Sequence, residues 1–487
     1  MLTTHDPIMG ARTAEPLDLL LVNAPLRDYA LRPRVNDYTL PVLGMAYIAT
    51  YAAAQGCNVA VLDAEAHGLS VADTIALINR AAPRWAGFNL LAPTYAISAT
   101  IAAALDPHIR IMVGGHHAKA MPDRILTDPR LTRCDALVIG EAETRVVELL
   151  ADHRNRVGLP GVMWRDPIMG TPVTGGQPGT NRHLAPDINA LPFVDRTYLA
   201  QDPYVADDDG RTEANMVGAR GCPYDCSDCG AAVSANPDVT IRVRKPANIL
   251  AEMHHLHDRY GATAFRFVDD LFLGARRVID QMMGAFAAEK VGEWAVWDAT
   301  GRINVLHRLP DATLDLLTAC GLREVALGIE SGSERMLAYI DKRITCGMVT
   351  GVVRRLTARG IRVKGYFILG FPTETRAELA ATVDLIHRLW DLTDTADGTF
   401  RASVFQFRPY PGTPEWDRLM ATGHYTAEQL LDYAPVDLGA DDAALRGRDE
   451  FNFSSGLQFG EATEEEIHWR LAELAREQHG RAVGSAA

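Results

Sequence analysis

The sequence predicts an α/β protein with three parts: a doubly wound parallel sheet, a partial barrel of six strand–helix units, and a small C-terminal extension. The 487 residues exceed the size at which a single hydrophobic core usually stops growing. Short apolar strands alternate with helical patterns at the spacing of parallel sheets. A stretch rich in Pro, Gly and Asp, residues 156–210, separates two such series and is predicted to be a linker.

The first series predicts a Rossmann-like domain over residues 1–155. Its strands are expected at 17–22, 57–62, 85–90, 109–113 and 136–139, with helices at 44–54, 71–82, 95–104 and 143–152. Ligands of such sheets bind beyond the carboxyl ends of the strands. Asn23, Gly114 and Gly140 lie at these ends.

The second series predicts a partial (βα)6 barrel of the TIM type over residues 211–424. Its strands are expected at 214–219, 264–268, 295–299, 324–329, 362–369 and 402–407, with helices such as 247–260, 278–289 and 348–359. Chemistry in such barrels sits at the carboxyl ends of the strands. The extension, residues 425–487, ends in a predicted helix at 463–478, and we expect it to close or cover the substrate site.

Composition excludes several classes of protein. Hydrophobic residues make up 47% and charged residues 23%, and the formal net charge is −14. This acidity argues against nucleic acid as a partner, because phosphate backbones need a basic face. No apolar run reaches the length of a membrane span, and no signal pattern begins the chain, so we expect a cytoplasmic protein that does not contact the membrane.

Three of the seven cysteines, Cys222, Cys226 and Cys229, fall within eight residues as C-x3-C-x2-C. Thiolates this close along the chain can ligate one soft metal centre. Cubane iron–sulfur clusters normally take four thiolates, and no fourth cysteine is near, so one iron would stay open to a small molecule. Zinc is disfavoured because no further ligand stands at finger spacing. The Pro, Asp and Ser residues between the thiols, with a Gly on each side of the motif, indicate a tight loop and not a core strand.

This loop resembles the signature of the radical S-adenosylmethionine (SAM) superfamily. Further resemblances follow in the family's order: Val268-Asp-Asp270-Leu-Phe272, Gly328-Ile-Glu330-Ser331-Gly-Ser-Glu334 and Ile368-Leu-Gly370-Phe-Pro372-Thr-Glu374. The resemblance implies a 4Fe–4S cluster held by the three cysteines, whose open iron binds SAM. It implies SAM contacts from Tyr224, Asp270, Thr300, Arg302, Glu330, Ser331 and Gly370. One position departs from the family, because Asp228 stands where an aromatic residue usually packs against adenine.

The first domain resembles the cobalamin-binding domain that precedes the barrel in one radical SAM subclass. The matching pieces are Asn23-Ala-Pro25, Leu40-Pro-Val-Leu-Gly44, Val113-Gly-Gly-His116 and Gly140-Glu141. Glycines in these loops let a large flat ligand approach the backbone. The resemblance implies cobalamin contacts from Asn23, Pro25, Gly44, Gly114, Gly115, His116, Gly140 and Glu141. The Asp-x-His-x-x-Gly string that supplies a cobalt ligand in another cobalamin group is missing, since His67 stands two positions too late after Asp63.

The two resemblances together imply a methyltransferase that acts on an unactivated carbon through a 5′-deoxyadenosyl radical and methylcobalamin. They imply a small-molecule or natural-product-type substrate and an external one-electron reductant of the flavodoxin or ferredoxin type. Alternatives within the subclass are ring contraction, cyclisation or oxidation without methyl transfer, and a non-catalytic corrinoid-binding protein is an alternative of another class. A methylthiotransferase is disfavoured because the first domain has only Cys57 and Cys134. An electron-transfer protein is disfavoured because it needs a fourth cluster ligand.

Overall fold

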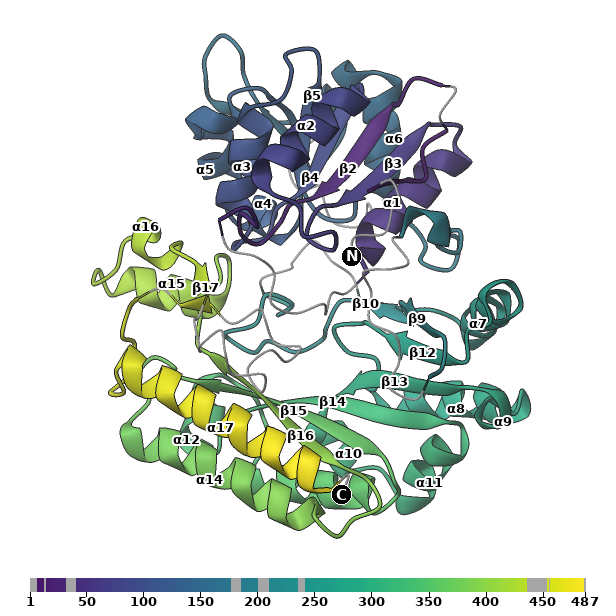
Figure 1. Ribbon diagram of the computed structural model, residues 1–487, viewed down its shortest axis with the longest axis vertical. Coiled ribbons are helices and arrows are strands. Elements are labelled where there is room, and N and C mark those ends of the chain that lie inside the picture. The colour runs from purple at the N-terminus through teal and green to yellow at the C-terminus, as the bar shows by residue number, and fades with distance from the viewer. Residues whose placement is uncertain are drawn as a thin grey trace. The chain divides into compact units, whose positions relative to one another are not determined.

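The computed structural model in Figure 1 describes residues 7–12, 15–31, 41–176, 185–199, 210–234, 241–435, 453–454 and 456–485. Leu40, quoted above, lies outside these residues. The chain divides into two compact units, the first formed mainly by residues 1–205 and the second mainly by residues 206–487. No helix of the described residues is long and apolar enough to span a membrane.

The first unit is built on an eight-stranded sheet of order β1-β3-β2-β4-β5-β6-β7-β8. The five central strands are parallel, and they are β3 (Val59–Asp63), β2 (Leu19–Asn23), β4 (Trp85–Asn89), β5 (Arg110–Gly114) and β6 (Cys134–Val138). Three short antiparallel strands form the edges, β1 (Ile8–Met9), β7 (Val162–Arg165) and β8 (Pro172–Thr174). The order reverses between β2 and β4, which is the place where such sheets bind ligands. The doubly wound sheet predicted from the sequence is confirmed.

Helices cover this sheet, and a capping serine marks the start of one of them. They are α1 (Leu43–Ala54), α2 (Val71–Ala81), α3 (Tyr95–Ala103), α4 (His116–Ala120), α5 (Pro122–Thr127) and α6 (Glu143–Ala151). The Ser70 hydroxyl accepts from the Asp73 backbone N–H at 3.0 Å and so caps α2. Leu77 and Ile78 of that helix join the core beneath it with Leu20 and Val22 of β2.

The sheet continues into residues 156–210, which the sequence predicts to be a linker, because β7 pairs with β6 and β8 pairs with β7. Each strand has at most four residues, too few to show an alternating pattern. The exact domain boundaries stay a prediction.

The second unit contains six parallel strands in the order β16-β15-β14-β13-β12-β9. They are β9 (Glu213–Met216), β12 (Ala264–Phe267), β13 (Val296–Gly301), β14 (Leu322–Glu330), β15 (Arg362–Leu369) and β16 (Phe400–Gln406). In the described residues β9 and β16 are the two edges, so the barrel is open. This confirms the partial (βα)6 barrel. Two-stranded sheets join β10 (Ala219–Arg220) to β11 (Arg242–Val243), and β17 (Ala434–Pro435) to β18 (Phe453–Ser454).

One face of the barrel sheet packs against helices and the other is polar. Phe265, Trp297, Val325, Phe367 and Phe400 point to the helical side and join one large core. The helices of this unit are α7 (Pro246–Tyr260), α8 (Arg276–Ala288), α9 (Val291–Trp294), α10 (Ile303–His307), α11 (Asp311–Ala319), α12 (Glu334–Tyr339), α13 (Cys346–Thr357), α14 (Arg376–Thr393), α15 (Pro414–Ala421), α16 (Ala427–Leu430) and α17 (Glu464–Ser485). Because successive side chains of a strand point to opposite faces, the residues that alternate with these core residues face the concave side.

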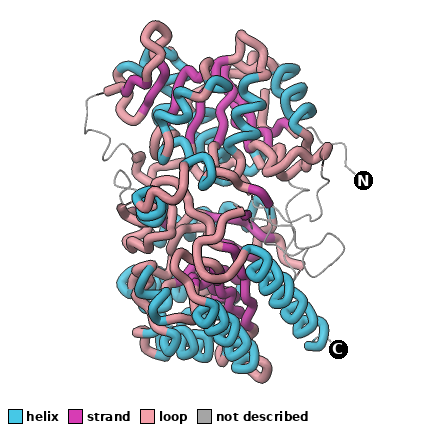
Figure 2. Tube along the Cα trace, turned by 90° about the vertical axis from the view of Figure 1, so that its left-hand side faces the viewer, coloured by secondary structure: helices cyan, strands magenta, loops and turns pink. Residues whose placement is uncertain are grey.

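The C-terminal helix α17 runs beside the barrel sheet in both views (Figures 1 and 2). Its Ile467, Leu471 and Leu474 enter the core on the helical side. His468 lies 2.8 Å from the amide oxygen of Gln406 in β16. The helix therefore belongs to the outer layer of the barrel, and the expectation that the extension covers the substrate site stays a prediction.

Candidate active site

The three cysteines lie on a loop that follows β10 at the carboxyl end of the first barrel strand. Turn hydrogen bonds order this loop: the Cys229 N–H donates to the Cys226 carbonyl at 3.1 Å, and the Ala232 N–H to the Cys229 carbonyl at 3.1 Å. The Ser227 N–H donates to the carbonyl of Ile340, just after α12, at 3.1 Å. The loop is thus fixed both internally and to the rim of the barrel.

The donor set of this loop fits an iron–sulfur cluster. All three thiols are free of disulfides, with Cys226 buried and the other two half-buried. The Ala231 N–H donates to Cys229 Sγ at 3.4 Å, and such bonds stabilise thiolates. In the described residues no three His, Cys, Asp or Glu side chains converge to hold a single ion. A cubane needs no such convergence, because its irons are each bound by a different thiolate.

Arg302 links the cysteine loop to the barrel rim. Its Nη1 donates to Cys226 Sγ at 3.3 Å, and its Nη2 donates to the Lys342 carbonyl at 2.5 Å. The guanidinium lies 4.0 Å from the ring centroid of Tyr224, which comes from the same loop. Arg302 is the residue before α10 and is 7% exposed.

A buried ion pair lies at the end of β14. Lys342 Nζ donates to Glu330 Oε1 at 2.5 Å, and both residues are less than 10% exposed. Burial is the largest single influence and lowers the pKa of Lys342, but the negative charges of Glu330, Cys226 and Asp228 together outweigh it and raise the pKa. Burial and then the charge of Glu330 raise the pKa of Asp228 to about 6. Asp228, the departure noted in the sequence, is therefore part of a charged group and does not stand in for an aromatic wall.

Two neighbouring acids in the turn after β12, Asp269 and Asp270, have different surroundings. Asp269 is buried and accepts from the Gly218 N–H at 2.8 Å, so it anchors the strand before the cysteine loop. Asp270 is exposed, and its charge raises the pKa of Cys222 after the larger effect of burial. The Thr300 hydroxyl accepts from Phe272 N–H at 3.2 Å and donates to the Asp269 carbonyl at 3.0 Å. The structure thus uses Thr300 to hold the turn.

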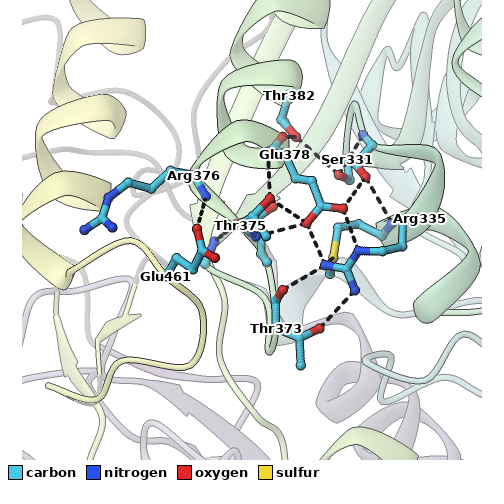
Figure 3. A network of polar contacts seen from close by, with 12 residues as sticks. Ser331, Arg335, Thr373, Thr375, Arg376, Glu378, Thr382 and Glu461 are labelled. Atoms are coloured by element: carbon cyan, nitrogen blue, oxygen red, sulfur yellow. Dashed lines mark hydrogen bonds and ion pairs between the residues drawn. The ribbon is translucent and has the colours of Figure 1, made fainter.

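Ser331 belongs to a polar network behind the site, which Figure 3 shows. Its hydroxyl lies 3.2 Å from that of Thr382 in α14 and accepts from the Ser333 N–H at 3.1 Å. Arg335 pairs with Glu378 at 2.6 Å and donates to the Thr373 carbonyl at 2.7 Å. This network ties the end of β14 to the end of β15. The hydroxyl of Ser331 is therefore engaged within the protein.

The turn after β15 is held by a buried acid, the last residue of the motif quoted for this turn, which was not among the predicted site residues. The Gly370 N–H donates to Glu374 Oε2 at 2.7 Å, and Glu374 is 2% exposed. Burial raises the pKa of Glu374 to about 7. The backbone of Gly370 is thus oriented by a side chain four residues later.

Glu415, at the start of α15, is a second residue missed from the sequence. It is fully buried, and its carboxylate accepts from the Tyr339 hydroxyl at 2.6 Å, from Arg418 at 2.9 Å and from the Ser227 hydroxyl at 3.4 Å. Its own N–H donates to the Ser227 carbonyl at 2.9 Å. Ser227 lies between two of the cysteines, so Glu415 holds the cysteine loop against α12 and α15. The Pro-Gly-Thr-Pro-Glu run before α15 was the available signal.

In the first unit, two buried acids hold the loop after β2. Asn23 donates through Nδ2 to Asp63 at 2.8 Å. Glu65 accepts from the Leu26 N–H at 2.7 Å and from the Tyr29 hydroxyl at 2.6 Å. Pro25, between these contacts, is buried. The side chains of Asn23 and Pro25 are therefore part of the loop's own support.

The other loops at this edge expose glycine backbone. Gly44 lies in the first turn of α1, is exposed, and has open space where a side chain would be. Gly115 has a φ of +96°, and a Cβ there would lie 2.3 Å from Asn89 Oδ1. The neighbouring Gly114 is half-buried, whereas His116 and Gly140 are exposed, and the Glu141 carbonyl accepts from Arg145. Open backbone such as that at Gly44 lets a large flat ligand approach closely.

His117, next to the predicted contact His116, is buried. It is 2% exposed, and both ring nitrogens lack a hydrogen-bond partner among the described residues. Its ring centroid lies 4.7 Å from that of Tyr95. Burial, followed by the charge of Arg124, lowers the pKa of His117 to about 4. The imidazole is therefore neutral at pH 7, and no described residue satisfies its two ring nitrogens.

Comparisons with known proteins assign both units. Residues 35–150 match the B12 binding domain, and residues 216–386 match the Radical SAM superfamily. An uncharacterised methyltransferase of Pyrococcus horikoshii is 28% identical, with 86% of each chain covered. Cytidylyl-2-hydroxyethylphosphonate methyltransferase of Streptomyces wedmorensis is 24% identical, with 80% of this chain and 79% of that protein covered.

Solved structures agree with this fold. The radical SAM methyltransferase TsrM from Kitasatospora setae, solved with tryptophan substrate and a SAM analogue, has a TM-score of 0.62 at 18% identity and covers 85% of this chain and 78% of its own. The cobalamin-dependent SAM radical enzyme OxsB has a TM-score of 0.61 at 14% identity and covers 95% of this chain and 66% of its own. With a radical SAM domain present, the non-catalytic corrinoid-binding alternative is set aside. A B12 binding domain followed by a radical SAM domain makes this chain a cobalamin-dependent radical SAM enzyme.

Proposed function

We propose that the enzyme transfers a methyl group to an unactivated carbon of a small-molecule substrate. One observation carries the proposal: three free thiols on one turn, fixed by Arg302 and Glu415, occur in the same chain as a B12 binding domain. When bound, the cluster and SAM supply a radical that removes a hydrogen atom, and cobalamin supplies the methyl group. The names of the two methyltransferase relatives support methyl transfer.

The chain's residues then have distinct roles. Cys222, Cys226 and Cys229 hold three irons and leave the fourth for SAM. Arg302 fixes Cys226 and keeps Tyr224 beneath its guanidinium. The buried pair of Glu330 and Lys342 offers a charge of each sign at the strand end, which suits the ammonium and carboxylate groups of SAM. Burial of these charges strengthens their interaction with a ligand.

The hydrogen bonds around each of the other predicted contact residues suggest its role. Asp270 and the Gly370 backbone are proposed to contact SAM directly. Thr300 and Ser331 act by holding the turns that carry Asp270 and Glu330, since their hydroxyls are already used. In the first unit we propose that cobalamin rests on the loops containing Asn23, Pro25, Gly44, Gly114, Gly115, His116, Gly140 and Glu141. The external reductant and the cytoplasmic location stay predictions from the sequence.

The test uses anaerobically reconstituted enzyme, dithionite, and SAM with a deuterated methyl group. Methyl transfer yields S-adenosylhomocysteine and 5′-deoxyadenosine in equal amounts with each deuterated product molecule. Formation of 5′-deoxyadenosine without S-adenosylhomocysteine contradicts methyl transfer. That outcome supports cyclisation, the second candidate, which is favoured by a 25% identical relative named anaerobic magnesium-protoporphyrin IX monomethyl ester cyclase of Rubrivivax gelatinosus.

A further inference from the structure

The C-terminal extension is bonded to the turn that follows β15 and to the start of α14. The Thr373 N–H donates to the Phe459 carbonyl at 3.1 Å, and the Glu461 N–H donates to the Glu374 carbonyl at 2.8 Å. Figure 3 shows a third contact, in which the Arg376 N–H donates to the Glu461 carboxylate at 3.1 Å. Three hydrogen bonds thus join this turn to one short segment of the extension.

This segment, residues 459–461 (the brace), fits closely against the turn. A Cβ at Gly460 would lie 2.7 Å from the Glu374 carbonyl oxygen and 2.9 Å from that of Phe371. Both neighbours are backbone atoms, which cannot rotate away as the end of a side chain can. Any residue larger than glycine at position 460 therefore requires the brace to move off the turn.

Helix α17, which follows the brace, contacts the same turn. Its start is fixed by two reciprocal hydrogen bonds, from the Thr463 N–H to the Glu466 carboxylate at 2.7 Å and from the Glu466 N–H to the Thr463 hydroxyl at 3.2 Å. Glu466 also pairs with Arg376 at 2.9 Å. The buried Ile467 packs on Gly370, where a Cβ would lie 2.6 Å from its Cδ1.

Aromatic rings pack the brace against the end of β16. The ring centroid of Phe407 lies 5.2 Å from that of Phe371 in the turn and 5.3 Å from that of Phe459 in the brace. The ring of Tyr425, earlier in the extension, lies 5.4 Å from that of Phe459. Aromatic pairs at such distances add to the stability gained by burial. Packing and hydrogen bonds therefore hold the brace in the same place.

These contacts converge on the turn whose backbone is proposed to contact SAM. Gly370 has a φ of +85°, and its N–H donates to the carboxylate of Glu374. Glu374 is 2% exposed and lies against Gly460 of the brace. The extension thus holds the turn from outside, at Gly370 and at Glu374. A binding turn that is already ordered loses less conformational freedom when the ligand binds, so its affinity is higher.

We propose that residues 459–467 of the C-terminal extension are positioning residues for SAM, because they hold the turn 370–374 in its binding conformation. They act through the backbone of Gly370. The inference rests on the proposed function, because the contact between Gly370 and SAM belongs to that proposal. It adds a role for the extension in the affinity for SAM.

The test measures the dissociation constant of SAM for full-length, anaerobically reconstituted enzyme by isothermal titration calorimetry, without reductant so that SAM is not cleaved. Gly460→Ala is expected to weaken SAM binding by about tenfold, because the added methyl group pushes the brace off the turn. Glu461→Ala removes the acceptor of the Arg376 N–H and is expected to weaken it by about threefold. Glu461→Gln keeps an acceptor oxygen and is expected to bind SAM like the parent.

Gly480→Ala in α17 is the matched control, because a Cβ at Gly480 meets no other atom within contact distance. The titrations are made well below the melting temperature, where a variant that is only less stable is still folded and binds SAM normally. The iron content of Gly460→Ala is expected to equal that of the parent. Its KM for SAM in 5′-deoxyadenosine formation is expected to rise, while kcat at saturating SAM stays level.

Equal SAM affinity in Gly460→Ala and the parent overturns the proposal, as does an equal loss in Gly480→Ala. A loss of SAM binding that only follows a loss of iron also overturns it. If Gly460→Ala does not fold, the pair Glu461→Ala and Glu461→Gln decides, and equal affinity in these two overturns the proposal. A parent enzyme that binds no SAM contradicts the proposed function itself.

Discussion

The two units differ in the groups that lie at the carboxyl ends of their parallel strands. In the first unit the edge consists of backbone and glycine, and the acids Asp63 and Glu65 are turned inward to hold the loops. In the second unit buried charged side chains lie at the edge. Arg302 donates a hydrogen bond to the Cys226 thiol, and Glu330 forms an ion pair with Lys342. The carboxyl ends of parallel strands thus offer mainly backbone in one unit and buried charges in the other.

This difference follows from the ligands that each unit accepts. A corrin is large and flat, so contact over a wide area is gained by removing side chains from the loops. SAM and a cluster are small and charged, so fixed charges in a partly buried site hold them more effectively. Substitutions are therefore expected to act through shape in the first unit and through charge or ligation in the second.

The largest expected effect is that of Cys226→Ala. Loss of the central thiolate removes one of three cluster ligands and the acceptor of Arg302. We expect iron content near zero and no 5′-deoxyadenosine, with cobalamin binding kept. Iron analysis, the visible spectrum and product chromatography measure these. Cys57→Ser in the first unit is the control, and a Cys226→Ala enzyme that keeps its iron contradicts the assignment.

The next effect tests the support of the cysteine loop. Glu415→Gln keeps the side chain's shape but weakens its bonds to Tyr339, Arg418 and Ser227. We expect a loss of about 3 kcal/mol in the free energy of unfolding of the second unit, and a lower iron content after reconstitution. Chemical denaturation and iron analysis measure these two quantities.

Arg418→Gln serves as the matched control for Glu415→Gln. Arg418 contacts the same carboxylate, but about half of its side chain is exposed. Solvent screens this ion pair, so its loss changes stability by less than about 1 kcal/mol. If both variants lose iron equally, Glu415 does not act through Ser227.

The same contrast explains what could be predicted from the sequence. The long barrel strands were predicted within about two residues, because β14 and β15 alternate between a buried and a polar face over eight or more residues. The edge strands β1, β7 and β8 were missed, since strands of two to four residues show no period. The loops that were predicted to follow strands from their motifs do lie at the carboxyl ends of strands in both units.

The contacts that individual site residues make were harder to predict from the sequence. Glu415 supports Ser227 from 188 residues away, and nothing local in the sequence reveals such a pairing. Thr300 and Ser331 were expected to contact SAM, but their hydroxyls bond to backbone or to Thr382. Residue type and position at a strand end predict proximity to a site. They do not predict which hydrogen bonds the protein itself has already made.

A third prediction compares two glycines of the first unit. Gly115→Ala places a Cβ 2.3 Å from Asn89 Oδ1 at a φ of +96°, so we expect a loss of about 2 kcal/mol in unfolding free energy. Gly44→Ala meets open space in a helix, so stability is expected to stay level or rise slightly. Only Gly44→Ala therefore isolates the effect of a side chain on this open backbone.

Cobalamin affinity, measured by absorbance titration, is expected to fall in Gly44→Ala although the melting temperature does not. Gly44→Ala that binds cobalamin like the parent shows that this helix end does not approach the corrin. The predicted loss of stability in Gly115→Ala does not depend on whether Gly44→Ala binds cobalamin.

The smallest effects concern pH, and the two units are expected to respond in opposite directions. The pKa of His117 is about 4 when folded, below the ordinary 6.5, so between these values the unfolded state binds more protons. The first unit therefore loses about 2 kcal/mol of stability as pH falls from 7 to about 5. The pKa of Glu374 is about 7 when folded, above the ordinary 4.5, so there the folded state binds more protons. The second unit gains a similar amount over the same range.

His117→Leu and Glu374→Gln separate these two contributions. Neither substituted side chain titrates, and Gln keeps an acceptor for the Gly370 N–H. The melting temperature of His117→Leu relative to the parent should rise as pH falls from 7 to 5, because the parent loses stability there. That of Glu374→Gln should fall over the same range, because the parent gains stability. Differences that are flat with pH contradict the burial of these groups, and differences of the same sign contradict the contrast between the units.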